Sequence, residues 1–133
     1  MDPKIFSVEE ANQLIPKLKL LLEELRSLRD EIESKKVEMD LLEIVGSVSR
    51  VGSSEETPMS EQMEELNRMA GEFNRRLEEL EDMGCQVKDL DQGLVDFFSV
   101  REGHLVYLCW KEGEDSIQYW HTLDGGFKGR QPL

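Results

Sequence analysis

The sequence predicts an α+β fold in which a long antiparallel helical hairpin, similar to a coiled coil, precedes a three- or four-stranded antiparallel β-meander. Three observations lead to this prediction. Two apolar heptad seams lie on either side of one loop in residues 1–84. The apolar period then changes to two after Gly84. Seven of the nine aromatic residues fall in the last 49 residues, and aromatic side chains favour pleated, buried surfaces.

The first helix is expected to begin at a capping box, because Ser7 is followed three residues later by Glu10. Its apolar seam has spacings of four and three, and comprises Leu14, Leu18, Leu21, Leu25, Leu28 and Ile32. Pro16 removes a backbone donor and crowds the carbonyl of Asn12. We therefore expect a kink or a break near Ile15.

Residues 46–58 are rich in glycine and serine and follow neither period, which predicts a mobile loop. A second seam follows with the same spacing, and comprises Met59, Met63, Leu66, Ala70, Phe73, Leu77 and Leu80. The second helix is expected to run from about Pro58 to Met83, with Gly84 as its stop. Two seams joined by one loop can bury each other only by folding back, which predicts the hairpin at residues 1–84.

Four strands are expected after the hairpin, at residues 85–90, 94–100, 104–111 and 116–123, and their short connections favour sequential antiparallel order. The strand at 104–111 is apolar on both faces, so the sheet needs a cover on each side, and the hairpin supplies one. The second cover is either a partner subunit or the tail from Asp124 to Leu133, and we expect a homodimer or another homo-oligomer. Residues 85–133 thus form a meander and tail within a single domain, 1–133.

The composition excludes several classes of partner. The 16 basic and 29 acidic residues give a formal net charge of −13, so the chain repels nucleic acid backbones and anionic membrane surfaces. No apolar run approaches the roughly 20 residues that span a bilayer. Residues 1–6 lack the basic start and apolar block of a secretory signal, which predicts a cytoplasmic protein whose two cysteines stay reduced.

Short motifs near both ends of the chain point to one family. The first is FSVEEANQLIP at residues 6–16. The others are GLVDF at 93–97, VYLCW at 106–110, YWH at 119–121 and GFKGRQPL at 126–133. Taken together, they resemble a family of small bacterial and archaeal proteins of unknown function. The resemblance spans nearly the whole chain, and it implies no activity, cofactor or partner.

Two polar residues stand where a sheet built only for packing would not need them, Asp96 in the middle of a strand and His121 at the end of the last strand. Their strands can lie on either side of the strand that carries Cys109. Aspartate, histidine and the turn carboxylates Glu112 and Glu114 are ligand types for a divalent transition metal, and they could also act as an acid and a base. We favour the simpler interpretation, an inter-strand hydrogen bond or ion pair that fixes the register.

The other candidates carry less chemical information. Cys109 has no basic neighbour in the sequence, which favours a small buried hydrophobe over a nucleophile. Residues 125–130 combine glycines with Lys128 and Arg130, but they lack the strand-to-helix context of a phosphate loop. The candidate walls of a pocket are the aromatic residues Tyr107, Trp110, Tyr119 and Trp120.

The favoured function is a structural or interaction module that self-associates, because the sequence carries no recognisable catalytic motif. One alternative is a metal-binding protein or metal-dependent enzyme that uses Asp96, Glu114 and His121. Another is a small-molecule binder that uses Arg130 and the two tryptophans. The favoured function requires no cofactor, and a divalent metal belongs to the first alternative.

Overall fold

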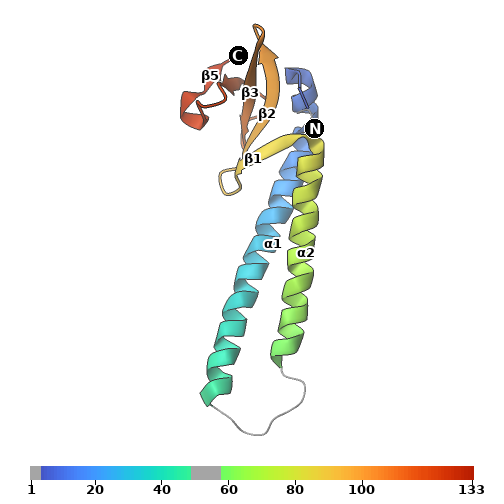
Figure 1. Ribbon diagram of the computed structural model, residues 1–133, viewed down its shortest axis with the longest axis vertical. Helices are drawn as coiled ribbons and strands as arrows, with labels where there is room; N and C mark the ends of the chain where they lie inside the picture. Colours follow the sequence, from blue (N-terminus) through green and yellow to red (C-terminus); the bar gives the residue numbers. More distant parts are fainter. Residues whose placement is uncertain (1–3, 49–57) are drawn as a thin grey trace. The chain divides into compact units, whose positions relative to one another are not determined.

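The computed structural model describes residues 4–48 and 58–133 (Figure 1). Two helices, α1 (Val8–Val48) and α2 (Pro58–Met83), precede a five-stranded antiparallel sheet. Its strands are β1 (Cys85–Asp89), β2 (Leu94–Arg101), β3 (His104–Lys111), β4 (Tyr119–His121) and β5 (Gln131–Pro132), in that order across the sheet. Neither helix, over the residues that are described, is long and apolar enough to cross a membrane. The predicted α+β fold is confirmed.

The predicted capping box closes the start of α1. The Ser7 N–H donates to Glu10 Oε1 at 2.9 Å, and the Glu10 N–H donates to Ser7 Oγ at 3.1 Å. These reciprocal bonds satisfy two backbone donors that have no partner within the helix. Because the bond from the Ser7 backbone favours the charged carboxylate, it lowers the pKa of Glu10.

α1 continues through Pro16, so the expected break near Ile15 does not occur. A proline inside a helix removes one backbone hydrogen bond and costs roughly 3 kcal/mol. Ala11, Ile15, Leu18 and Leu22 are all buried along the same stretch. Burial of each large apolar side chain contributes about 1.5–3 kcal/mol, which is enough to offset the proline.

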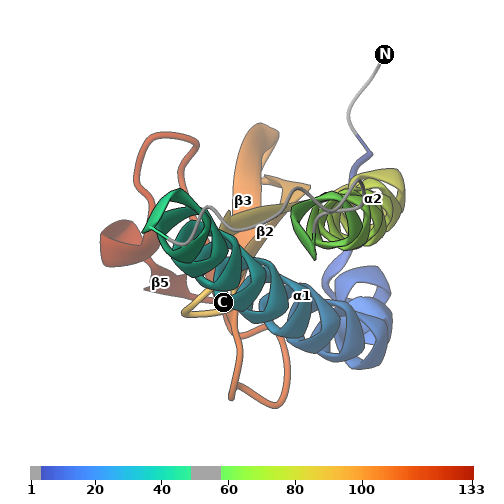
Figure 2. The ribbon, with the colours of Figure 1, turned by 90° about the horizontal axis from the view of Figure 1, so that it is seen from below.

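Two compact units divide the chain, one formed by residues 24–76 and the other by residues up to 23 together with 77–133. Within residues 24–76, α1 and α2 run side by side (Figures 1 and 2). Arg76 Nε lies 2.5 Å from Glu24 Oε2, and Lys35 Nζ lies 3.2 Å from Glu65 Oε2. The predicted loop starts later than expected, because α1 includes residues 46–48, and residues 49–57 lie outside the described part.

The other unit is built on the sheet, and one face of the sheet holds its core. The edge of the Phe6 ring meets the Phe97 ring, with centroids 5.2 Å apart. The Phe6 N–H donates to the Phe98 carbonyl oxygen at 2.8 Å, and the Ser99 hydroxyl donates to the Phe6 carbonyl oxygen at 2.6 Å. At the start of α1, Asn12 Oδ1 accepts a hydrogen bond from the Ile117 N–H. These contacts fix the residues before and within the first turns of α1 against the sheet.

The chain's own tail, one of the two covers predicted for the second face of the sheet, lies against the face opposite Phe97. Arg130 packs on the ring of Tyr119, and β5 adds a fifth strand by pairing with β4, Tyr119 with Pro132 and Trp120 with Gln131. A two-residue strand has no apolar alternation, which explains why the sequence predicts only three or four strands. The homodimer and the single-domain organisation stay predictions.

Ser7→Ala is expected to lower the free energy of unfolding by about 1 kcal/mol, because the Glu10 N–H loses its acceptor. The control is Ser27→Ala in the exposed middle of α1, expected to stay within about 0.5 kcal/mol of wild type.

Since the folded pKa of Glu10 is lowered, the stability from its charge is present above pH 4.5 and is lost as the pH falls through the folded pKa. Urea unfolding followed by circular dichroism measures both effects, and equal losses for the two serine variants would argue against the capping box.

Candidate functional site

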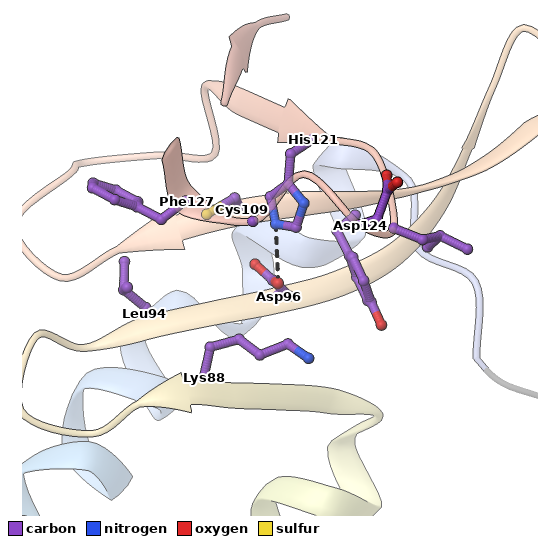
Figure 3. Close-up of a pocket in the computed structure, with 10 residues that line it drawn as sticks. Lys88, Leu94, Asp96, Cys109, His121, Asp124 and Phe127 are labelled. Atoms are coloured by element: carbon purple, nitrogen blue, oxygen red, sulfur yellow. Dashed lines mark hydrogen bonds and ion pairs between the residues drawn. The ribbon is translucent and has the colours of Figure 1, made fainter. Parts of the chain in front are cut away.

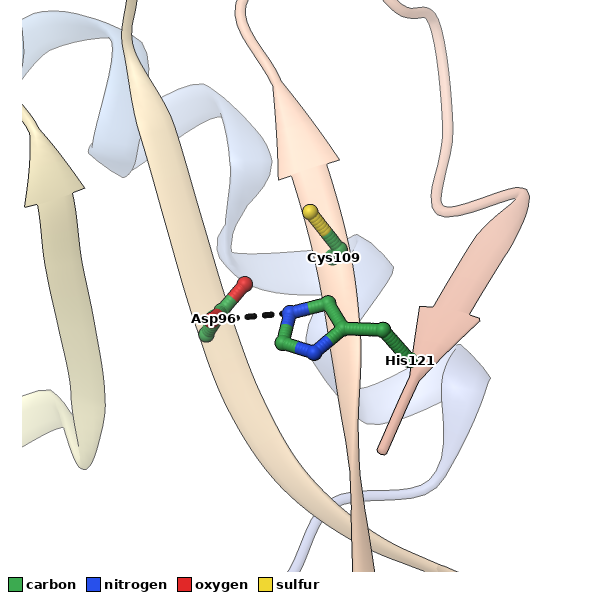
Figure 4. Close-up of side chains that lie close together, drawn as sticks. All are labelled: Asp96, Cys109 and His121. Carbon is green, nitrogen blue, oxygen red and sulfur yellow. Dashed lines mark hydrogen bonds and ion pairs between the residues drawn. The ribbon is translucent and has the colours of Figure 1, made fainter. Parts of the chain in front are cut away.

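Three polar side chains from three adjacent strands lie together on one face of the sheet (Figure 4). Asp96 of β2 pairs with Cys109 of β3, and His121 of β4 pairs with Tyr107, two residues away from Cys109. Because side chains alternate between faces, these three share the face opposite Phe97. One ligand atom of each lies within 4.8 Å of the other two, and all three residues are buried. The register of the sheet therefore builds the cluster.

His121 lies between the Asp96 carboxylate and a backbone carbonyl. Its Nε2 is 3.0 Å from Asp96 Oδ2, and its Nδ1 is 2.7 Å from the carbonyl oxygen of Thr122. A carbonyl oxygen only accepts, so Nδ1 must carry the proton of that bond. A neutral imidazole protonated there presents a lone pair at Nε2, and the carboxylate oxygen that faces it is also an acceptor. The two atoms can lie at this distance only with a proton or another cation between them.

Cys109 is a thiol that stays protonated when no cation is bound. Burial raises the pKa of Cys109 to about 12, the negative charge of Asp96 and a hydrogen bond to it act in the same direction, and the charge of Arg130 opposes them. Cys85, the other cysteine, lies with its Sγ 3.5 Å from the Leu80 carbonyl oxygen, and burial raises its pKa to about 11. Neither thiol is an activated nucleophile. A metal ion would change the state of Cys109, because coordination deprotonates a thiol.

The cluster opens onto a pocket of about 260 Å³ (Figure 3). Besides the three cluster residues, its lining comprises Lys88, Leu94, Tyr107, Leu123, Asp124, Gly126 and Phe127. The ligand atoms thus face a space that a small molecule can enter, rather than a filled core. A pocket where a few polar groups converge among apolar side chains is typical of a ligand site.

Arg130 fixes the tail that forms one wall of this pocket. Its Nη2 lies 2.5 Å from Glu114 Oε2, and its guanidinium lies 4.0 Å from the ring centroid of Tyr119 and 4.8 Å from that of Phe127. Glu114 in turn accepts a hydrogen bond from the Lys111 N–H at 2.8 Å. These contacts join the tail to the end of β3 and place Phe127 at the pocket.

The carboxylate predicted as the third metal ligand lies outside the cluster. Glu114 is the partner of Arg130, and Cys109 takes its place beside Asp96 and His121. Glu112 follows β3, where its N–H donates to the Gly93 carbonyl oxygen at 2.9 Å. Cys109 is buried and its pKa is raised, as its interpretation as a small buried residue predicted. Its position on the strand between those of Asp96 and His121 was the signal that could also have placed it in the cluster.

The four aromatic residues predicted as pocket walls divide between the two faces of the sheet. Tyr107 lines the pocket, and Tyr119 lies on the same face under Arg130. Trp110 and Trp120 alternate with cluster residues along their strands, so they face the other side. Trp110 is fully buried there, and Trp120 lines a second pocket, of about 420 Å³. Arg130 and the tryptophans therefore do not form the common site that the sequence suggested.

Fold and site together define a small α+β protein with a buried polar cluster beneath a pocket. A model of one family, described as an uncharacterized conserved protein (DUF2203), matches residues 4–133. The chain belongs to this family. Searches of curated proteins and of solved structures give no match. The chemistry of the site must therefore be inferred from its own residues.

Both cysteines are expected to react with a thiol reagent such as 5,5′-dithiobis(2-nitrobenzoate) far more slowly in the folded protein than in urea. Burial restricts access, and the raised pKa values, about 12 for Cys109 and about 11 for Cys85, keep the thiolate fraction low at neutral pH. The rate of colour release at neutral pH with and without urea measures this. A native Cys109 that reacts as fast as a free thiol would contradict the geometry.

Proposed function

We propose that this chain binds a divalent transition metal ion through Asp96, Cys109 and His121. The observation that carries the proposal is the meeting of three different ligand types within 4.8 Å at the base of a pocket. The close approach of His121 Nε2 to Asp96 Oδ2 is compatible with it, because a metal ion can replace the proton that this contact requires. The Thr122 carbonyl supports it too, since a backbone partner at Nδ1 commonly orients a metal-binding histidine.

Zinc fits this donor set best. One carboxylate oxygen, one thiolate and one imidazole nitrogen are all ligands that zinc accepts, and the two anionic ligands balance its charge. Three protein ligands leave the fourth tetrahedral position open, which is typical of catalytic rather than structural zinc sites. Because all three side chains line the pocket, a ligand from the pocket would take the remaining position. A cytoplasmic location, which we also propose, would keep Cys109 reduced and able to bind.

The competing function for these residues is purely structural. In that case the contact between Asp96 and His121 holds a proton and fixes the register of β2, β3 and β4. His121→Asn would then lower stability by about 1–3 kcal/mol without any change in metal content. The metal-binding function and the structural function can be told apart experimentally, because only metal binding depends on the Cys109 sulfur.

Purified protein is expected to contain close to one zinc ion per chain, and the metal-free protein should bind Co²⁺ with a thiolate-to-metal charge-transfer absorption. Cys109→Ser should abolish that absorption. Asp96→Asn and His121→Asn should weaken Co²⁺ binding by more than the roughly 10- to 100-fold that follows loss of a ligand's hydrogen-bond partner. Elemental analysis and an optical Co²⁺ titration measure these effects.

Cys85→Ser is the matched control, because Cys85 is also a buried thiol but lies outside the cluster. It should bind Co²⁺ as wild type does. Circular dichroism of each variant separates loss of binding from loss of fold. Folded wild-type protein that binds neither Zn²⁺ nor Co²⁺ would sink the proposal, and so would a charge-transfer absorption that survives in Cys109→Ser.

We also propose that the chain self-associates through α1. Val37, Leu41 and Ile44 are 58, 57 and 60 % exposed, and their spacings of four and three place them on one side of the helix. A second copy offers the same apolar stripe, and a two-fold dimer would cover both. Because residues 1–84 carry most of the net negative charge, added salt should favour the dimer.

Sedimentation equilibrium at physiological salt is expected to show a dimer, which Leu41→Glu should dissociate by burying a charge in the contact. Leu20→Glu, an equally exposed position elsewhere on α1, is the control and should remain dimeric. Wild-type protein that is monomeric throughout the micromolar range would contradict the proposal.

A further inference from the structure

We propose that the pocket above Asp96, Cys109 and His121 binds a small molecule with one carboxylate group, which takes the open position on the metal ion and pairs its charge with Lys88. The proposal deepens the metal-binding function and rests on it. Its support comes from the size of the pocket, from its apolar lining and from the placement of one cation at its wall.

The pocket suits a small ligand with an apolar body. Its volume of about 260 Å³ lies just below the roughly 300–1,000 Å³ of sites for drug-sized ligands. Leu94, Leu123, Tyr107 and Phe127 line it, so aliphatic and aromatic surface surrounds the metal position. An apolar group attached to the carboxylate would gain by leaving water for this surface.

Lys88 reaches the pocket from an irregular position in β1. The pairing of β1 with β2 shifts register between Val87 and Asp89, which makes Lys88 the extra residue of a β-bulge. Bulges re-aim side chains and are frequent next to functional sites. Here the bulged residue lines the same pocket as the cluster (Figure 3).

The ammonium group of Lys88 is positioned at the wall of the pocket and keeps hydrogen-bond donors available for a ligand. Its Nζ lies 2.8 Å from Gln86 Oε1 and 5.1 Å from the ring centroid of Tyr107. The Tyr107 hydroxyl donates to the same Gln86 oxygen, at 3.4 Å. An ammonium group has three donors, so this contact leaves others for a ligand oxygen.

The charges of the lining place the carboxylate of the ligand beside Lys88. A Zn²⁺ ion bound by the Asp96 carboxylate and the Cys109 thiolate is neutral as a unit, so the remaining charges of the lining are the Lys88 cation and the Asp124 anion, and Lys88 is the one that attracts a carboxylate. Asp124, on the opposite side of the lining, is exposed and accepts a hydrogen bond from the Thr122 hydroxyl at 2.9 Å. Its negative charge disfavours a ligand with a second carboxylate.

Co²⁺-loaded protein titrated with butyrate and with benzoate tests the inference, with butyramide and benzamide as neutral analogues of the same shape. The two carboxylates are expected to change the visible Co²⁺ spectrum saturably, and the amides should not. Lys88→Gln should weaken carboxylate binding by up to about fivefold, the range of a solvent-accessible ion pair, and Lys88→Glu should weaken it further. Lys128→Gln, an exposed lysine of the tail, is the matched control and should bind as wild type does.

The outcomes keep the two proposals apart. If the protein binds no Co²⁺, the metal-binding function fails, and the carboxylate site fails with it. If Co²⁺ binds with its thiolate absorption but no carboxylate alters the visible spectrum, the carboxylate site alone is overturned. Equal effects of acids and amides, or equal binding by wild type and Lys88→Glu, would also overturn it.

Discussion

The register of β2, β3 and β4 is the constraint on which the site depends. It places Asp96 opposite Cys109 and brings His121 to the next position on the same face. Because side chains alternate along a strand, a slip of one residue would exchange the two faces of the sheet. The apolar face resists such a slip, since Phe97 and Trp110 are fully buried on it. Packing on the apolar face therefore fixes the positions of Asp96, Cys109 and His121 on the opposite face.

Burial makes the cluster sensitive to the loss of any one member. Asp96 and His121 are 3 % and 2 % exposed, so each group depends on a few polar partners within the protein. A buried charge or lone pair without a partner costs several times what a normal hydrogen bond contributes.

Periodicity was sufficient to predict the helical hairpin and the order of the first four strands, since seams and alternation are properties of the local sequence. The break expected at Pro16 as an alternative to a kink does not occur, because burial of neighbouring side chains outweighs the lost hydrogen bond, and β5 was not predicted because it is too short to alternate. The contact between Asp96 and His121 was predictable because both are polar within apolar strands. The ion pair of Glu114 with Arg130 was not predictable, because Arg130 lies in the tail, and the bulge that presents Lys88 has no signature in the sequence.

The most direct measurement of the central claim is the X-ray absorption spectrum of the zinc-loaded protein at the zinc edge. A site made of Asp96, Cys109 and His121 predicts one sulfur at about 2.3 Å, with nitrogen and oxygen neighbours at about 2.0–2.2 Å. Loss of the sulfur neighbour in Cys109→Ser, and its retention in Cys85→Ser, would complete the assignment. A zinc ion surrounded only by oxygen and nitrogen in the wild-type protein would contradict it.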